Sequence, residues 1–395
     1  MPMSININHS AVIYNYLKQL GICKFITDTH TKHLVSIIHS VFSKGYHGKA
    51  VDFAAASDCH RTTVAHFLNL GRWDSEECRA ILKHNAVQDI YDESRRSSAP
   101  VYCVVDDTIA SHTKPSSQAL HPIEAAYFHQ SHLKNCQDYG HQAVAVLLAC
   151  NKVVRIYDVV MYDKTQTKIQ IVQNIANELP IPPVASYYLC DSWYTTQTVI
   201  DTFLMKGFYT IGALKVNRII YPRRRHISIR DFAEYIHVED KEVHLVTVRN
   251  RQFYVYRYDG KLNGISDASV ILSYPKEAFG NEKALRAFIS TDTSLSTQEI
   301  LDRYCKRWPI ELFFRESKNK LAWDKYQIRS KLGISRYWMI LCLVYNMCRS
   351  YSGISRTFTE GYHYIEEILK VERNTNIYHL VRSSRDLSAF LECVE

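Results

Sequence analysis

The sequence predicts an α/β protein in which a mixed sheet with helices is interrupted by a mainly β insertion and preceded by an α-helical N-terminal region. Residues 1–98 have helical periodicity, and from Ala99 onward apolar, β-branched runs alternate with helical segments. Residues 215–283 show strand-like alternation between turn residues. With 395 residues, 46% hydrophobic and 22% charged, the chain is long enough to bury a sizeable core.

Residues 1–98 are predicted to form a helical DNA-binding domain. Residues 31–42 repeat apolar side chains at helical spacing, and the run Gly45-Tyr46-His47-Gly48 ends that helix. The segments KAVDFAAAS and RTTVAHFLNLGRW, joined by the polar turn DCH, have the form of a helix-turn-helix. Its recognition helix would begin with Arg61, Thr62, Thr63 and His66. Any small helical bundle gives the same pattern, so both interpretations stay open.

Residues 99–214 are predicted to hold the first part of the core. The apolar run 100–105 predicts a buried strand that ends at Asp106-Asp107-Thr108, and the polar, aperiodic residues 111–140 predict a long loop. The elements expected next are two hairpin strands (141–150 and 153–162), a helix (164–179) that Pro180 stops, a strand (186–190), a helix (193–206) and a strand (208–214).

The insertion, residues 215–283, begins with a basic run that includes Arg223, Arg224 and Arg225. Three strands are expected in it, in the segments EVHLVTVRN, RQFYVYRYDG and ASVILSY. Residues 285–291 are predicted to return to the core sheet. Residues 284–350 then form the second part of the core, and residues 351–395 a helical tail. The longest apolar run, 337–348, is too short to span a bilayer and predicts a buried helix.

Four residues in the second part of the core, Tyr304, Arg307, Glu311 and Lys318, have the spacing Y-x2-R-x3-E-x6-K. Because an α-helix repeats every 3.6 residues, they fall close together on one helical face, and Arg315 joins them. Pro309 should start or bend the helix. A carboxylate among cations suits a divalent metal with phosphate beside it. The alternative is an ordinary surface helix with a Glu311–Arg315 ion pair.

Two aspartates are expected at strand ends, Asp107 after the first strand and Asp191 after a later one. Carboxyl ends of parallel strands meet at one edge of a sheet, where Glu311 from a packed helix can join them. Three carboxylates there can share two Mg²⁺ ions for phosphoryl transfer. Each aspartate has a simpler explanation, because Asp106-Asp107-Thr108 can be a turn and Asp191 a helix N-cap. Strand alternation does not decide between Asp106 and Asp107.

Composition adds weaker constraints. The net charge of +8 permits a polyanionic partner without requiring one. The 11 cysteines form no CxxC pair, and the N-terminus lacks the order of a signal peptide, so we expect reduced cysteines in a cytoplasmic protein without a zinc motif. We expect the histidines of the long loop to make hydrogen bonds within the protein rather than to bind a metal. They are His112, His121, His129, His132 and His141.

The sequence resembles the DDE transposases of bacterial insertion sequences, in the IS-four-like branch with the Y-x2-R-x3-E-x6-K signature. The resemblance covers roughly residues 99–350 and implies a ribonuclease-H-like fold. It also implies that the first catalytic acid is the Asp directly before a Thr, which selects Asp107, followed by Asp191 and Glu311. These acids would bind two Mg²⁺ or Mn²⁺ ions, and Tyr304, Arg307 and Lys318 would contact DNA phosphates.

The family resemblance further implies cut-and-paste transposition at the terminal repeats of an element, by a protein that is a homodimer at least on DNA and acts at the bacterial nucleoid. Some relatives hold a flipped base with a tryptophan in the insertion, but residues 215–283 contain none. Trp193, or a tyrosine of the insertion (Tyr254, Tyr256 or Tyr258), could take that role. The basic run Arg223 to Arg225 would bind the DNA backbone or form a solvated loop.

Two other functions fit the same residues. A ribonuclease-H-like nuclease that cuts without joining would use the same acids but would have less need for the basic stripe and the large insertion. A domesticated DNA-binding protein would use residues 1–98 and carry an inert core. The presence of all three acids argues against the second alternative.

Overall fold

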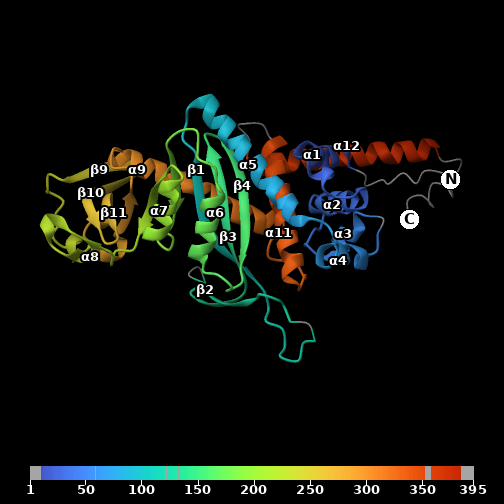
Figure 1. Ribbon diagram of the computed structural model, residues 1–395, viewed down its shortest axis with the longest axis horizontal. Helices are drawn as coiled ribbons and strands as arrows, with labels where there is room; N and C mark the ends of the chain where they lie inside the picture. The colour runs from blue at the N-terminus through green and yellow to red at the C-terminus, as the bar shows by residue number, and fades with distance from the viewer. Residues whose placement is uncertain (1–9, 58, 121, 132–133, 352–356, 384–395) are drawn as a thin grey trace.

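The computed structural model describes residues 10–57, 59–120, 122–131, 134–351 and 357–383. A helical region, a central sheet and a β-rich region follow one another along its long axis (Figure 1). The described strands form one sheet of 12 strands, with the order β2-β3-β1-β5-β6-β12-β11-β10-β7-β8; β4 pairs with β3, and β9 with β10. The α/β class with a mixed sheet, predicted from the sequence, is therefore confirmed.

Helices form the N-terminal region, and several of them begin at side-chain caps. The N-terminal helices are α1 (Ala11–Leu20), α2 (Asp28–Val41), α3 (Ala50–Ala55), α4 (Arg61–Asn69) and α5 (Ser75–Ser97). Ser10, Thr27 and Asp74 each accept a hydrogen bond from a backbone N–H in the first turn of α1, α2 and α5. The two short helices predicted on either side of the DCH turn are present as α3 and α4.

The core strands are β1 (Tyr102–Ser111), β2 (Tyr127–Ser131), β3 (Cys136–Cys150), β4 (Val153–Tyr162), β5 (Ser186–Cys190) and β6 (Phe208–Leu214), with helices α6 (Lys168–Glu178) and α7 (Gln197–Met205) between them. Strand β1 is antiparallel to β3 and parallel to β5, which is parallel to β6. The strand–hairpin–helix–strand–helix–strand order predicted for this part is confirmed.

Two predictions about the first strand and the following loop are wrong. Strand β1 continues to Ser111, so Asp106 and Asp107 lie inside it rather than at its end. Residues 111–140 are not all loop, since they contain β2 and the start of β3. The polar residues stay in the strand because β3 supplies backbone partners as far as the pair Ser111 and Gly140. A Cβ at Gly140 would lie 2.0 Å from the Ala110 carbonyl oxygen, so the strands approach closely there.

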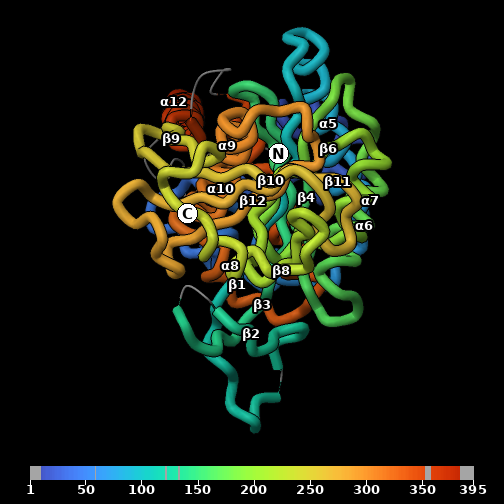
Figure 2. The backbone as a smooth tube through the Cα atoms, turned by 90° about the vertical axis from the view of Figure 1, so that its left-hand side faces the viewer, coloured from blue at the N-terminus to red at the C-terminus, as the bar shows by residue number. Residues whose placement is uncertain are grey.

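The β-rich region extends the core sheet instead of forming a separate one. It contains β7 (Ile219–Ile220), β8 (Ile227–Ser228), α8 (Ile229–Ala233), β9 (Val243–Val248), β10 (Arg251–Leu262) and β11 (Ile265–Pro275). Strand β12 (Arg286–Ser290) joins β11 to β6, antiparallel to both. Figure 2, viewed from this end of the molecule, shows β10, β11 and β12 in front of the core strands. The three strands predicted in this segment, and the return strand, are confirmed.

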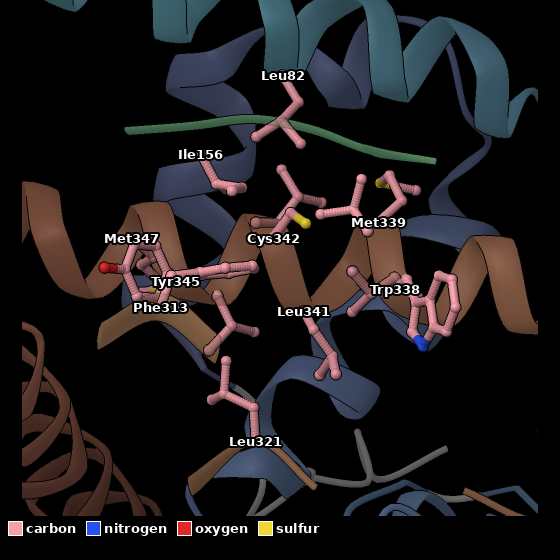
Figure 3. Packing of buried hydrophobic residues seen from close by; sticks show 14 of the residues in the cluster. Leu82, Ile156, Phe313, Leu321, Trp338, Met339, Leu341, Cys342, Tyr345 and Met347 are labelled. Atoms are coloured by element: carbon pink, nitrogen blue, oxygen red, sulfur yellow. The ribbon is translucent and has the colours of Figure 1, made fainter. Parts of the chain in front are cut away.

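The predicted signature helix consists of three consecutive pieces. Helix α9 (Thr297–Tyr304) leads through a 3₁₀ turn (Cys305–Arg307) into α10 (Trp308–Lys320). Pro309 lies in the first turn of α10, as expected of a proline that starts a helix. The predicted buried helix is α11 (Lys331–Tyr351), and α12 (Phe358–Ser383) follows it. Figure 3 shows Trp338 and Tyr345 of α11 among side chains that include Leu82 of α5 and Phe313 of α10.

Apolar side chains cover both faces of the central sheet. On one face, Val104 and Leu189 pack in the cluster that contains α10, α11 and the N-terminal helices. On the other face, Cys103 and Tyr188 pack against α5, α6 and α7. Burying a large apolar side chain contributes about 1.5–3 kcal/mol, so both layers hold the sheet rigidly. Any residue of β1 is therefore assigned to the α10 face or to the α6–α7 face by its place in the alternation.

Candidate active site

Strand pairing brings Asp106 and Asp191 to the same face of the sheet. In the parallel pair of β1 and β5, Val104 lies opposite Leu189. Asp106 follows Val104 by two residues within β1, and Asp191 follows Leu189 by two residues, directly after the end of β5. Successive side chains alternate between faces, so both aspartates share the face of Val104 and Leu189. Helix α10, which carries Glu311, packs on that face. Asp106, in the middle of β1, and Asp191, just after β5, therefore lie on the side of the sheet that α10 covers.

Arg307 links two of these carboxylates. Its Nη1 donates to Asp106 Oδ2 at 2.7 Å, and its Nη2 donates to Glu311 Oε1 at 2.6 Å. Burial lowers the pKa of Arg307, but Asp106, Tyr304 and Glu311 outweigh burial and leave it above its usual value. The guanidinium remains charged and fixes the distance between the first and the third acid.

Burial and negative charge act together on the two aspartates. Burial raises the pKa of Asp106 to about 6; Arg307 opposes this shift, and Asp191 and Asp107 add to it. Burial also raises the pKa of Asp191, with the backbone N–H of Trp193 opposing and Asp107 adding. Both aspartates are thus harder to ionise than an ordinary carboxyl group, and a cation bound beside them would favour their ionised forms.

Asp107 points to the opposite face of β1. Its Oδ1 accepts from Gln142 Nε2 at 2.7 Å, and its Oδ2 accepts from Lys168 Nζ at 2.8 Å and from the Tyr194 hydroxyl at 2.5 Å. These partners come from β3, from the start of α6 and from the turn between β5 and α7. No sequence pattern singled out Gln142, Lys168 or Tyr194. Tyr194 follows Asp191 by three residues, and no spacing rule marks the other two.

The cations of the signature do not all face the acids. Lys318 Nζ donates to Thr108 Oγ1 at 2.8 Å and to the Ile109 carbonyl at 3.1 Å, and burial lowers its pKa. Burial raises the pKa of Tyr304 to about 12, with Arg307 opposing the shift. Arg315 is exposed on α10. Tyr304 and Arg307 therefore lie beside the acids, whereas the Lys318 side chain contacts β1 beyond Asp106 and Asp107.

The residues considered for holding a flipped DNA base fall into two groups. Trp193 is 49% exposed, and the Nζ atoms of Lys168 and Lys215 lie 4.7 Å and 5.1 Å from its ring centroid. The tyrosines of β10 pack inside the β-rich region instead: Tyr254 contacts Phe279, Tyr256 contacts Phe232, and Tyr258 donates to the Lys261 carbonyl. The basic run is exposed, and Arg223 and Arg224 have positive φ.

Some ring nitrogens of the predicted loop histidines have hydrogen-bond partners, and others have none. His141 is hydrogen-bonded to the Glu124 carbonyl through Nε2 and to the Tyr326 hydroxyl through Nδ1, each at 2.8 Å. His112 and His129 each have a buried Nε2 without a hydrogen-bond partner. His121 and His132 lie outside the described residues.

The donor types at the three acids fit a divalent cation, since carboxylate oxygens are the ligands that Mg²⁺ and Mn²⁺ prefer. Over the ranges that the structure describes, no group of three or more His, Cys, Asp and Glu side chains is close enough together to form a metal site by itself. Arg307, which bridges Asp106 and Glu311, balances two of the three charges.

A family model for the transposase DDE domain matches residues 98–347, which include Asp106, Asp191, Glu311 and the complete signature. The chain therefore belongs to the transposase DDE domain family, a class of enzymes that act on DNA. No curated protein matches it. Among the described helices, none has both the length and the apolar character that crossing a membrane requires.

Proposed function

We propose that the chain is a cut-and-paste transposase of the IS-four-like branch that cleaves DNA at the ends of an insertion sequence and joins the freed end to target DNA. The strand order β4-β3-β1-β5-β6, which is the order expected of a ribonuclease-H-like core, supports this assignment. The observation that carries the proposal is the bridge from Asp106 through Arg307 to Glu311, at the point where Asp191 reaches the same face.

The acids proposed to hold Mg²⁺ or Mn²⁺ are Asp106, Asp191 and Glu311. The motif of an Asp directly before a Thr favours Asp107, but the face shared with Asp191 and the bridge to Glu311 favour Asp106. Two bound ions would supply an activated nucleophile and stabilise the leaving oxygen in an in-line phosphoryl transfer. The contribution of the three carboxylates is to fix the donor positions on a rigid sheet and a packed helix.

Arg307 and its neighbours are proposed to bind the scissile phosphodiester. The planar guanidinium of Arg307 can exchange a carboxylate partner for a phosphate, which it contacts with two parallel hydrogen bonds. Tyr304 lies beside it, and Lys318 and Arg315 extend the cationic side of α10. Arg223, Arg224 and Arg225 are proposed to contact the backbone further away, which would position the duplex without reading its sequence.

A cavity of about 450 Å³ lies next to Tyr304, with Ser192, Ala213 and Phe288 among its lining residues. Its mixed polar and apolar walls suit a base that is turned out of the duplex. Trp193 is not among the lining residues of this cavity, but it is half exposed and follows Asp191 by two residues, and it is the aromatic side chain that we assign to stack on such a base. The β10 tyrosines are not proposed for this role because they pack against their own region.

The remaining assignments follow from the same proposal. Residues 1–98 would bind the terminal repeats, with the exposed residues Arg61, Thr62, Thr63 and His66 of α4 as the reading surface. Residues 99–214 and 284–350 would form the catalytic core, residues 215–283 an insertion, and residues 351–395 the tail. Two DNA ends must be held together, so a homodimer on DNA is proposed.

A strand-transfer assay tests the proposal against its two alternatives. The full chain is incubated with Mn²⁺, a labelled duplex that carries the element's own end, and a supercoiled plasmid. A transposase produces 3′-hydroxyl ends that become covalently joined to the plasmid. Cleavage without joined product would identify a nuclease. Binding of the end without metal-dependent cleavage would identify a DNA-binding protein with an inert core.

A further inference from the structure

The side chain of Asp107 is part of a largely buried polar cluster that has no role in the proposed reaction. The cluster consists of Asp107, Gln142, Lys168 and Tyr194, and it lies on the face of β1 opposite Asp106. Three donors hold the two carboxylate oxygens, so the Asp107 carboxylate has a fixed orientation. A metal ion at Asp107 would have to displace an ammonium or a phenol that is already in place.

The same cluster reaches the turn that carries Asp191. Tyr194 is fully buried, and its hydroxyl donates to Asp107 Oδ2 at 2.5 Å. Asp191 Oδ1 accepts from the backbone N–H of Trp193 at 2.9 Å, and the Asp191 carbonyl accepts from the backbone N–H of Tyr194 at 3.3 Å. The position of the Tyr194 ring therefore fixes the backbone groups that orient the Asp191 carboxylate.

Lys168 supports the turn from a second direction. Its Nζ donates to Asp107 Oδ2 and also lies 4.7 Å from the ring centroid of Trp193 and 5.9 Å from that of Tyr194. The ammonium thus joins the Asp107 carboxylate to both aromatic residues of the turn. Loss of Asp107 would leave a buried phenol and a largely buried ammonium without their acceptor, and the turn would have to rearrange to satisfy them.

We propose that Asp107 is a positioning residue for Asp191. It fixes the turn between β5 and α7 through Tyr194 and Lys168, so that the Asp191 carboxylate faces Asp106 and Glu311, and it does not ligate the metal itself. This inference rests on the proposed function, in which Asp106, Asp191 and Glu311 bind the metal. The two neighbouring aspartates of β1 then have different roles: Asp106 binds the metal, and Asp107 holds another metal ligand, Asp191, in position.

The test measures Mn²⁺ binding directly, by the loss of the free Mn²⁺ signal in electron paramagnetic resonance, with end cleavage as a second readout. The full-length variants are Asp106→Asn, Asp107→Asn, Tyr194→Phe and the double variant Asp107→Asn/Tyr194→Phe. Tyr157→Phe is the matched control, because Tyr157 is a buried tyrosine on the same face whose ring contacts Lys83 instead. Near-ultraviolet circular dichroism confirms that each variant is folded.

Removing the support of a metal ligand lowers metal affinity about 10- to 100-fold. Asp107→Asn and Tyr194→Phe are each expected to weaken Mn²⁺ binding by about tenfold without changing the number of ions bound. The double variant should be no weaker than the worse single one, because both changes break the same link. Cleavage should recover at high Mn²⁺ in Asp107→Asn and Tyr194→Phe but not in Asp106→Asn, and Tyr157→Phe should match the wild type.

Two results would overturn the inference and leave the proposed function standing. In one, Asp107→Asn loses a bound Mn²⁺ and all cleavage while Asp106→Asn keeps both, which would make Asp107 the ligand. In the other, Asp107→Asn and Tyr194→Phe bind Mn²⁺ as the wild type does while Asp106→Asn fails. If Asp106→Asn, Asp191→Asn and Glu311→Gln all bind Mn²⁺ and cleave normally, the proposed function fails, and this inference fails with it.

Discussion

Asp106 and Asp107 are neighbours in β1, yet the two faces of that strand give them different surroundings. On the α10 face, Asp106 has one charged partner, Arg307, which it shares with Glu311. On the α6–α7 face, Asp107 has three donors of its own. A carboxylate that shares a cation can release it to a ligand, whereas one with three donors is held in place. The environment of Asp106 is therefore suited to binding a metal ion, and that of Asp107 to holding neighbouring residues in position.

The largest effect is expected when an acid of the α10 face is neutralised. Glu311→Gln keeps the shape of the side chain but removes the charge that a divalent cation needs, so end cleavage should fall by about 1,000-fold or more. Glu316→Gln, five residues later on α10, is the control and should cleave within about twofold of the wild type. Equal activity of Glu311→Gln and wild type would place the catalytic acids elsewhere.

Replacing Arg307 should have the next largest effect. Arg307→Lys keeps the charge but cannot donate to Asp106 and Glu311 as a planar fork, so cleavage should fall by about 10- to 100-fold. Single-turnover rates on the end duplex measure the change, and affinity for that duplex is measured separately by fluorescence anisotropy. Arg303→Lys, on α9, is the comparison. A lysine that restores full activity would show that the bridge is not required.

The pH dependence of stability should differ between wild type and Asp106→Asn. The folded protein holds a proton on Asp106 up to a pKa of about 6, compared with 3.8 for the ordinary carboxyl group, so the folded state binds more protons between these values. This group's contribution to the free energy of unfolding therefore falls as pH rises from about 4 to about 6. Thermal denaturation without added metal should show a shallower decline over that interval in Asp106→Asn. The opposite slope difference would contradict burial as the dominant cause.

The sequence predicted the elements of the core well because their signals are local. The bounds of β4, β5 and β6 were predicted from apolar, β-branched runs, and Pro309 marked the start of α10. The extent of β1 was not predictable in the same way, because its polar half is held in the sheet by β3, which begins more than twenty residues later. Local propensity favours a turn at Asp106-Asp107-Thr108, and the tertiary pairing overrides it.

The candidate site was predictable in type but not in orientation. The signature includes Tyr304, Arg307 and Glu311; the structure joins Arg307 to both Asp106 and Glu311, and it brings Tyr304 near Asp191. Alternation along β1 divides its residues into two sets without saying which set faces α10. That choice depends on the register of β1 with β5, a contact between distant segments. Lys168 and Tyr194 were missed for the same reason, since only the fold brings them to Asp107.

The smallest effect on turnover is expected from Lys168→Met. This substitution changes the α6–α7 face of β1 but leaves the backbone of the turn between β5 and α7 unchanged. Asp107 would keep Gln142 and Tyr194 but lose its ionic partner at a largely buried position, so the melting temperature should fall by several degrees. Cleavage at saturating Mn²⁺ should stay within about threefold of the wild type, because the Tyr194 hydroxyl still holds the turn. Lys164→Met is the control, since Lys164 lies over the ring of Tyr127. If Lys168→Met abolished cleavage while its melting temperature stayed unchanged, Lys168 would belong to the chemistry, and the division between the two faces of β1 would not hold.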